Sequence, residues 1–250
     1  MSRKVLFFTI VIVFLFSVLT SAQGVDDVIK KYVEARGGLK NLQAIKTIKM
    51  TGKFLTQGIE APFLLRVKRP NCLRVEITFQ GQSIIQAYDG KTDWWVFPFQ
   101  GITEPQAMPE ARAKDFIAKA DMDGALVGYK KKGHKVELMG KEDVEGTEAY
   151  KLKVTLKNGR VWYVYLDAEN HLELKIFTTI NRQGNELEVH SYSSDYKEIN
   201  GVMFPHSLED KIGSATNEQI VIEKIELNTD IDDSIFKKPE KKEEKQSPEK

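Results

Sequence analysis

The sequence contains a single cysteine, Cys72, among its 250 residues. One cysteine cannot form an intramolecular disulfide, and it also excludes metal sites built from several thiolates and redox pairs of cysteines. Because Leu73, Val75 and Ile77 follow it in alternation with polar residues, we expect Cys72 to lie in a strand as a buried, unreactive thiol. Packing, and not covalent cross-links, must therefore stabilise the fold.

Catalytic and metal-binding motifs are lacking as well. The histidines are His134, His171, His190 and His206, and no two of them have the spacing of a His-Glu-x-x-His zinc site. The sequence has neither a Gly-x-Ser-x-Gly nucleophile elbow nor a glycine-rich phosphate loop. Most carboxylates alternate with lysines on the expected exposed strand faces, so no catalytic pair stands out. We expect no enzymatic activity, no cofactor and no metal ion.

No excess of charge of either sign points to a partner. The chain has 37 Lys and Arg against 36 Asp and Glu, and the two signs are interleaved. A nucleic-acid-binding protein would need a basic stripe, so we expect no nucleic-acid partner. The end of the chain is different, because Lys237 to Lys250 includes no apolar residue. Such a segment cannot bury itself, and we expect residues 239–250 to be a disordered tail.

A long apolar run occurs only at the N-terminus. Arg3 and Lys4 precede the nearly pure apolar run from Val5 to Val18, and the small residues Thr20 to Ala22 follow it, as in a cleaved signal peptide over residues 1–22. An uncleaved membrane anchor is the alternative, but the run is shorter than the roughly 20 residues that span a bilayer. A lipid anchor would need a cysteine directly after the run. We therefore expect the mature chain to be periplasmic or secreted, without a lipid anchor.

From Thr47 to Leu227 the sequence is a nearly unbroken series of short segments in which apolar and polar residues alternate, as in β-strands. Turn signals separate the strands, and residues 98–108 are expected to form a loop because they are rich in proline. Helices do not alternate with the strands, as they would in a parallel sheet. We predict a mainly β (α+β) fold with a single curved antiparallel sheet of about ten to eleven strands, in one domain over residues 23–238.

Three segments have the apolar spacing of helices: residues 25–36, 39–45 and 110–120. The first ends at a pair of glycines, and the second should place Leu39 and Ile45 on the same core. Helices of this kind can cover one face of a curved sheet.

Several of the expected strands carry bulky apolar residues on both faces. A sheet of this kind must cover one face with its own helices or with a ligand. Trp94 and Trp95 should point to opposite faces, one inside and the other covered outside. The alternation of apolar residues identifies a candidate ligand wall on the concave side. Plain core packing is the alternative explanation, and a one-residue bulge would turn the side chains of a strand to the other face. The candidates are Phe63, Leu65, Val75, Ile77, Trp94, Val96, Trp162, Val164, Leu174 and Ile176.

The order and spacing of several motifs resemble the LolA-like superfamily of outer membrane lipoprotein-sorting proteins, over essentially the whole mature chain. The matching stretches are Ala35 to Leu39 followed by Ile48 to Gly52, Tyr88 to Trp95, Gly124 to Glu142, Tyr165 to Asp167, Asp195 to Pro205, and Ile225 to Phe236. The resemblance implies an unclosed β-barrel with helices as a lid and a hydrophobic cavity that holds acyl chains. It also implies an arginine on an early strand that helps to hold the lid shut. Arg66 and Arg74 are both candidates for this arginine.

These observations together predict a monomeric periplasmic carrier or sensor that binds lipid acyl chains or lipoproteins in a half-barrel. Its partners would include proteins of the inner and outer membranes. The alternative is a protein-interaction or regulatory module of the envelope on the same scaffold, and a hydrolase is a distant third.

Overall fold

The computed structural model describes residues 24–182, 185–213 and 215–240. The expected signal peptide, residues 1–22, and most of the expected tail, residues 239–250, lie outside the described residues. Within these described ranges, no helix combines the length and the apolar character needed to cross a membrane.

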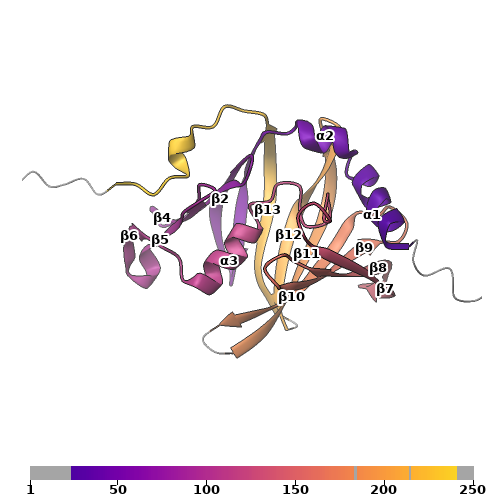
Figure 1. Cartoon of the computed structure of the whole chain (residues 1–250). Coiled ribbons are helices and arrows are strands. Elements are labelled where there is room, and N and C mark those ends of the chain that lie inside the picture. The colour runs from indigo at the N-terminus through magenta and orange to yellow at the C-terminus, as the bar shows by residue number, and fades with distance from the viewer. Residues whose placement is uncertain (1–23, 183–184, 214, 241–250) are drawn as a thin grey trace, which may run out of the picture.

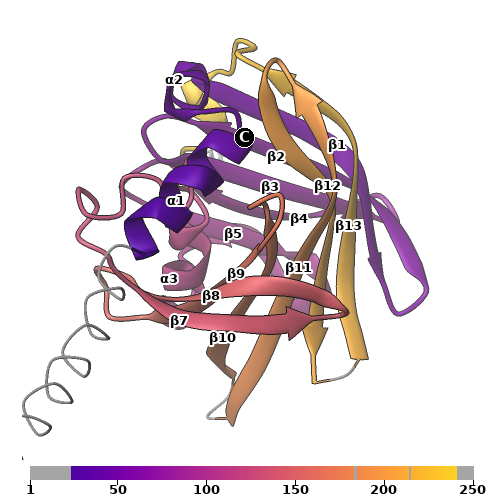
Figure 2. The same cartoon turned by 90° about the vertical axis from the view of Figure 1, so that its right-hand side faces the viewer.

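A single antiparallel sheet of 13 strands forms the body of the protein, and it curves around the helices (Figures 1 and 2). The strands are β1 (Thr47–Thr56), β2 (Ile59–Lys68), β3 (Cys72–Phe79), β4 (Gln82–Tyr88), β5 (Asp93–Phe97), β6 (Ile102–Gln106), β7 (Lys135–Val144), β8 (Thr147–Thr155), β9 (Val161–Asp167), β10 (Glu173–Arg182), β11 (Asn185–Ile199), β12 (Val202–Ile212) and β13 (Ala215–Leu227).

The chain builds the sheet outward in two halves. β1 to β6 follow one another from the middle to one edge, and β7 to β13 return from the opposite edge to pair with β1. The two edge strands, β6 and β7, do not pair with each other. The sheet is therefore an unclosed barrel, as predicted.

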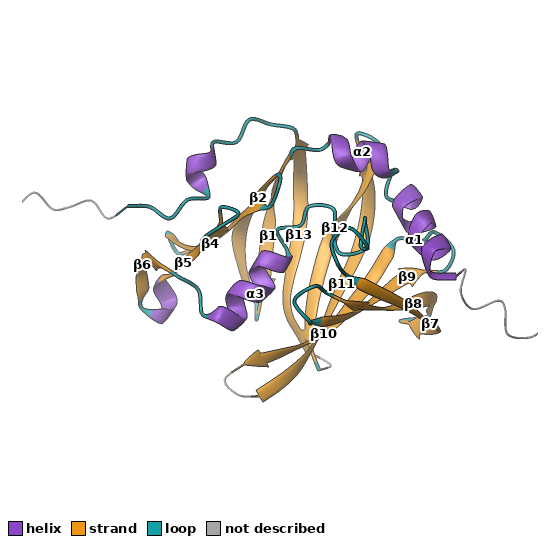
Figure 3. Ribbon diagram, viewed as in Figure 1, coloured by secondary structure: helices purple, strands orange, loops and turns teal. Residues whose placement is uncertain are grey.

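In the described part of the chain, three α-helices lie against the concave side of the sheet (Figure 3): α1 (Gly24–Ala35), α2 (Leu39–Ala44) and α3 (Glu110–Ala118). α1 buries Val28, Ile29 and Tyr32, which share one face because of their helical spacing. The helix ends before Gly37, whose φ of 110° favours glycine. A Cβ at Gly37 would also lie 2.0 Å from the carbonyl oxygen of Gly201, so the close approach of α1 to the β11–β12 turn requires a glycine.

The main hydrophobic core lies between the concave face and the helices. It joins residues from both halves of the sheet, such as Ile48 of β1 and Leu152 of β8, to Phe116 of α3. Leu126 and Val127 of the segment between α3 and β7, residues 119–134, belong to the same core. The helices and this segment are thus packed parts of the domain and not appendages.

The C-terminal segment, residues 228–240, covers the convex face of β2 to β5. Phe236 is completely buried, and its carbonyl oxygen accepts a hydrogen bond of 2.8 Å from the indole Nε1 of Trp94. The Arg74 side chain donates to the carbonyl oxygen of Ile235 at 2.7 Å, and the Lys68 ammonium donates to that of Ile231 at 2.7 Å. Strands that are apolar on both faces are therefore covered on this outer face by the chain itself.

The predicted fold class is confirmed, with differences in detail. β6 forms within the segment that we expected to be a loop, because Ile102 pairs with Phe97 across a short connection. The expectation that Leu39 packs on the core is wrong, since this side chain is 47% exposed, whereas Ile45 is buried. Cys72 is half-buried in β3, and burial raises the pKa of its thiol.

We expect Phe236→Ala to lower the free energy of unfolding by about 3 kcal/mol, because it leaves a cavity at a fully buried ring. Chemical denaturation measures the change. The matched control is Phe99→Ala, whose ring is 46% exposed and should cost less than about 1 kcal/mol. Equal losses in the two variants would contradict a structural role for the C-terminal segment.

Candidate functional site on the concave face

The concave face carries a wall of apolar side chains that stay partly exposed. Leu65, Val75, Trp162 and Ile176, all predicted wall residues, are half-buried and pack against the main core. Val164 faces the same side but is only 1% exposed, so it is a core residue. The wall therefore draws on both halves of the sheet.

Phe63 and Ile77 also belong to the concave face. They are direct partners in the register between β2 and β3, and they alternate in step with Leu65 and Val75. Phe63 is 4% exposed and Ile77 is half-buried. Ile77 extends the wall, whereas Phe63 is buried and does not contribute exposed surface to it.

Three of the predicted wall residues lie on the convex face instead. Trp95 and Phe97 belong to the inner core, so Trp94 and Val96, which alternate with them, point outward. Trp94 is the tryptophan that the C-terminal segment covers. Leu174 sits at a register shift between β9 and β10, which places it in a separate cluster on the convex face. The prediction was wrong at these positions because strand parity alone does not fix direction.

Sequence reasoning missed three further wall residues. Met50 of β1, Leu208 of β12 and Ile220 of β13 are half-buried and pack against the main core. Leu208 and Ile220 are direct partners in the sheet. Alternation in β1, β12 and β13 indicates that these three residues face one side of the sheet. Only the pairing of β1 with β13 shows that these strands lie next to the predicted wall.

Two surface hollows in the described part of the chain lie away from the concave side, where the oily hollow was expected. One lies on the convex face near Tyr163, and the other lies at the turns near Gly146 and Ala168. On the concave side, the chain's own side chains from α1 to α3 and from residues 119–134 pack against the wall. We call this arrangement, in which the chain covers its own concave face, the closed form.

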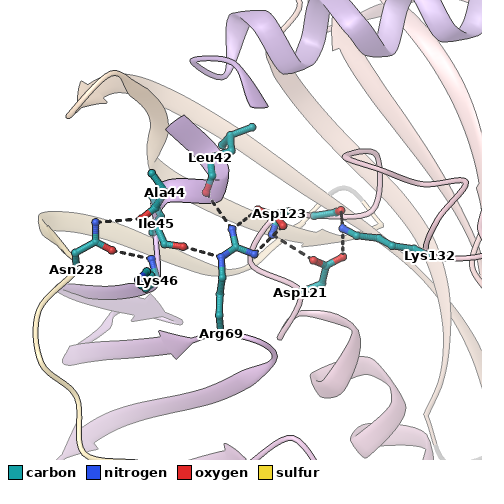
Figure 4. Close-up of polar contacts among 10 residues, drawn as sticks. Leu42, Ala44, Ile45, Lys46, Arg69, Asp121, Asp123, Lys132 and Asn228 are labelled. Carbon is teal, nitrogen blue, oxygen red and sulfur yellow. Dashed lines mark hydrogen bonds and ion pairs between the residues drawn. The ribbon is translucent and has the colours of Figure 1, made fainter. Parts of the chain in front are cut away.

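Arg69, directly after β2, ties two of the covering segments together (Figure 4). Its guanidinium binds both carboxylate oxygens of Asp123, at 2.8 and 2.5 Å, and also donates to the carbonyl oxygens of Leu42 and Ile45 at 3.0 and 2.6 Å. The Asp123 side chain is 16% exposed, and the hydrogen bond from Arg69 holds the pKa of its carboxyl below the usual value. We call Arg69 and Asp123 the latch.

The latch is supported on both sides (Figure 4). The Lys132 ammonium bridges Asp121, at 2.5 Å, and the carbonyl oxygen of Gly124, at 2.7 Å, which shapes the loop that presents Asp123. On the other side, the Asn228 side chain accepts from the Lys46 backbone amide at 2.7 Å. Arg66 and Arg74, the two candidates for an arginine that holds the lid shut, bind Glu76 on the convex face instead. Arg69 is the early arginine that contacts the covering segments.

A polar cluster lies partly buried beneath the end of α1. Arg36 donates to the hydroxyl of Tyr32 at 2.9 Å, and the Tyr196 hydroxyl donates to the backbone carbonyl of Glu173 at 2.8 Å. The Glu173 carboxyl accepts from Ser193 at 3.4 Å, and burial raises its pKa although the positive charge of Arg36 opposes this effect. The cluster places charge in an otherwise apolar interior.

The concave site is made mainly of apolar side chains. Among the residues that the structure describes, no group of three His, Cys, Asp or Glu side chains is placed to hold a metal ion. His206 is buried, and its Nδ1 lies 3.1 Å from the carbonyl oxygen of Phe204. The concave site is formed by contacts between its apolar wall and its covering segments.

We expect Arg69→Met to lower the free energy of unfolding by about 2 kcal/mol, because it leaves the shielded Asp123 carboxylate without its partner. The control is Lys130→Met, which breaks an ion pair to Asp26 whose side chains are 68% and 60% exposed, and it should change stability far less than Arg69→Met does. Denaturant unfolding of both variants and of the double variant with Asp123→Asn measures the coupling. Additive losses for Arg69 and Asp123 would contradict the latch.

Glu173 should make stability fall as the pH rises. Its pKa in the folded protein lies above the usual 4.5, so the folded state binds its proton more tightly than the unfolded state. This contribution is complete below pH 4.5 and is lost as the pH rises through the raised value. Glu173→Gln should flatten this part of the stability profile, measured by denaturation from pH 4 upward. An unchanged profile would show that Glu173 titrates normally.

Neither the models of known protein families nor the sequences of curated proteins gave a match to this chain. Solved structures, in contrast, gave matches. A LolA superfamily protein from Nitrosomonas europaea is 16% identical, with a TM-score of 0.58 over 86% of this chain and 97% of that chain. A DUF1329 family protein from Desulfovibrio piger is 12% identical, with a TM-score of 0.58 over 85% of this chain and 97% of that chain.

A third similar structure is a domain from Vibrio parahaemolyticus that is named for outer membrane lipoprotein sorting. It is 12% identical, with a TM-score of 0.56 over 84% of this chain and 94% of that chain. At these identities the likeness concerns the fold. The chain therefore has the fold of the LolA superfamily, an unclosed antiparallel β-barrel with helices on its concave side.

Proposed function

We propose that this protein is a periplasmic carrier or sensor that binds lipid acyl chains, free or attached to a lipoprotein, on its concave face. The observation that carries the proposal is the half-exposed apolar wall, to which Leu65, Val75, Trp162, Ile176, Leu208 and Ile220 contribute. A ligand that removes these apolar side chains from water stabilises the complex by about 25 cal/mol per Å² of apolar surface buried. The fold shared with the LolA superfamily protein is consistent with this use.

Binding requires the covering segments to move, because they occupy the concave side in the closed form. The latch is the polar obstacle to this movement, since it ties α2 and the loop at Asp123 to the end of β2. Opening exposes the apolar faces of the helices, and an acyl chain offsets this cost by covering the wall. The affinity therefore depends on how far the contacts between the wall and the acyl chain exceed those between the wall and the covering segments. Weakening the latch favours the opened protein and should tighten ligand binding.

A second candidate is an interaction or regulatory module of the envelope, for which the sheet is only a scaffold. The observation that favours it is the filling of the concave side by the protein's own side chains. In that case the outer surfaces would bind the partner, and no acyl ligand would be needed.

Leu208→Gln should weaken the binding of a fluorescent C16 fatty acid by about tenfold, because a polar amide then lines the wall. The control is Ser207→Gln, a neighbouring half-buried position on the opposite face of β12, which should leave the affinity unchanged. Fluorescence titration gives the two affinities, and native mass spectrometry of the protein isolated from its own periplasm identifies any co-purified lipid.

Failure of the wild-type protein to bind the fatty acid, together with an isolated mass that shows no lipid, would contradict the carrier. Binding that Leu208→Gln and Ser207→Gln weaken equally would contradict the concave site.

A further inference from the structure

The convex face of β8 to β12 carries a set of aromatic rings and lysines that the main core does not use. The sheet register brings Tyr163, Phe177 and His190 side by side on three neighbouring strands. The centroids of Tyr163 and Phe177 are 5.7 Å apart, and those of Phe177 and His190 are 4.9 Å apart. The rings are inclined by only 32° and 34° to one another. We call this row of rings the platform.

A second row of the same register lies beside the platform. In it, Lys175 stands between Tyr165 and Tyr192, and its ammonium lies 4.5 and 5.7 Å from their ring centroids. The Lys151 ammonium lies 5.2 Å from the ring centroid of Tyr163 and 5.6 Å from that of Tyr165. In cation–π contacts of this kind, the ammonium groups lie over the faces of the rings.

An open hollow of about 410 Å³ lies at the platform. Its lining includes the rings of Tyr163 and Phe177, with His190 and Glu188 of β11, Lys151 of β8 and Met139. Met139 of the edge strand β7 is 54% exposed, a high value for a large apolar side chain. The volume is within the range of about 300–1,000 Å³ that is typical of small-molecule sites, which combine an apolar surface with a few polar groups.

The charges around the platform pair with one another. Lys151 contacts Glu142 at 2.7 Å, and Lys211 contacts Glu145 at 2.8 Å. Glu188 adds a negative charge at the hollow, where its side chain is 69% exposed. An anionic polymer or an anionic membrane would therefore meet as many carboxylates as ammonium groups and gain little attraction.

We propose that the platform is a binding site for the sugar rings of a neutral oligosaccharide. The C–H face of a pyranose is apolar and flat enough to lie on the rings of Tyr163 and Phe177, which removes both surfaces from water. Its hydroxyl groups can donate to the Glu188 carboxylate and accept from the Lys151 ammonium. A neutral polyhydroxylated ligand suits a site that has apolar rings, one largely exposed carboxylate, which lies 4.0 Å from His190 Nε2, and little net charge.

This site is separate from the one proposed for acyl chains. Tyr163 and Phe177 of the platform pack against the small cluster on the convex face, whereas residues of the acyl wall pack against the core on the concave face. Sugar binding therefore requires no movement of α1, α2 or the latch. A fatty acid should neither displace the oligosaccharide nor compete with it.

The test uses the full mature chain and two uncharged probes, an oligomer of N-acetylglucosamine and maltotetraose, titrated by NMR and calorimetry. At least one probe should bind, with shift changes centred on β9 to β11, and Phe177→Ala should weaken binding at least tenfold. Phe177→Leu keeps the apolar volume if the alanine variant does not fold, and it should also weaken binding because the ring is lost. Thr179→Ala, an exposed position on the same face of β10, is the control and should bind as the wild type does.

Three results would overturn the proposal: no binding of either oligosaccharide, binding that Phe177→Leu leaves unchanged, or shift changes confined to another surface. Vesicles of phosphatidylglycerol serve as the anionic comparison, and binding of the platform to these vesicles in preference to the sugars would also overturn it. A failure here leaves the fatty-acid titration unaffected, so the two proposals stand or fall separately.

Discussion

The contact between the apolar inner face of an unclosed sheet and the chain's own helices is the constraint on which the rest of this structure depends. A sheet that does not close leaves its concave side open to water, and here that side carries residues such as Leu65, Ile176 and Ile220. Burying them stabilises the domain only while α1, α2, α3 and residues 119–134 stay in place. The same surface is therefore both core and potential binding site.

Polar groups decide how firmly that cover is held. Apolar contacts are not directional, whereas the guanidinium of Arg69 fixes the end of α2 and the loop at Asp123 through defined hydrogen bonds. Beneath α1, Arg36 and Glu173 place charge in the interior, where burial works against the ionised carboxylate. The cover thus combines nonspecific apolar packing with a few specific polar ties, and the proposed release of the cover would have to break both.

Much of the fold could be predicted from the sequence, because alternation along the strands and helical spacing in three segments depend on local residues alone. The direction of individual side chains could not be predicted as well. Trp94 and Trp95 had to face opposite ways, but which one faces outward depends on contacts with distant parts of the chain, such as that between Trp94 and Phe236. Leu174 was misplaced because a register shift interrupts its strand. The role of Arg69 was hidden because its partners are distant in sequence and its own position looked like an ordinary turn.

The central claim is that the helices leave the concave face when an acyl chain binds. Spin labels at Lys30 of α1 and Glu223 of β13, both exposed and placed in a Cys72→Ala background, report the separation of the cover from the sheet. Pulsed electron paramagnetic resonance should give one short distance without ligand and a longer one with a saturating C16 fatty acid. An unchanged distance in protein shown to have bound the fatty acid would contradict the account.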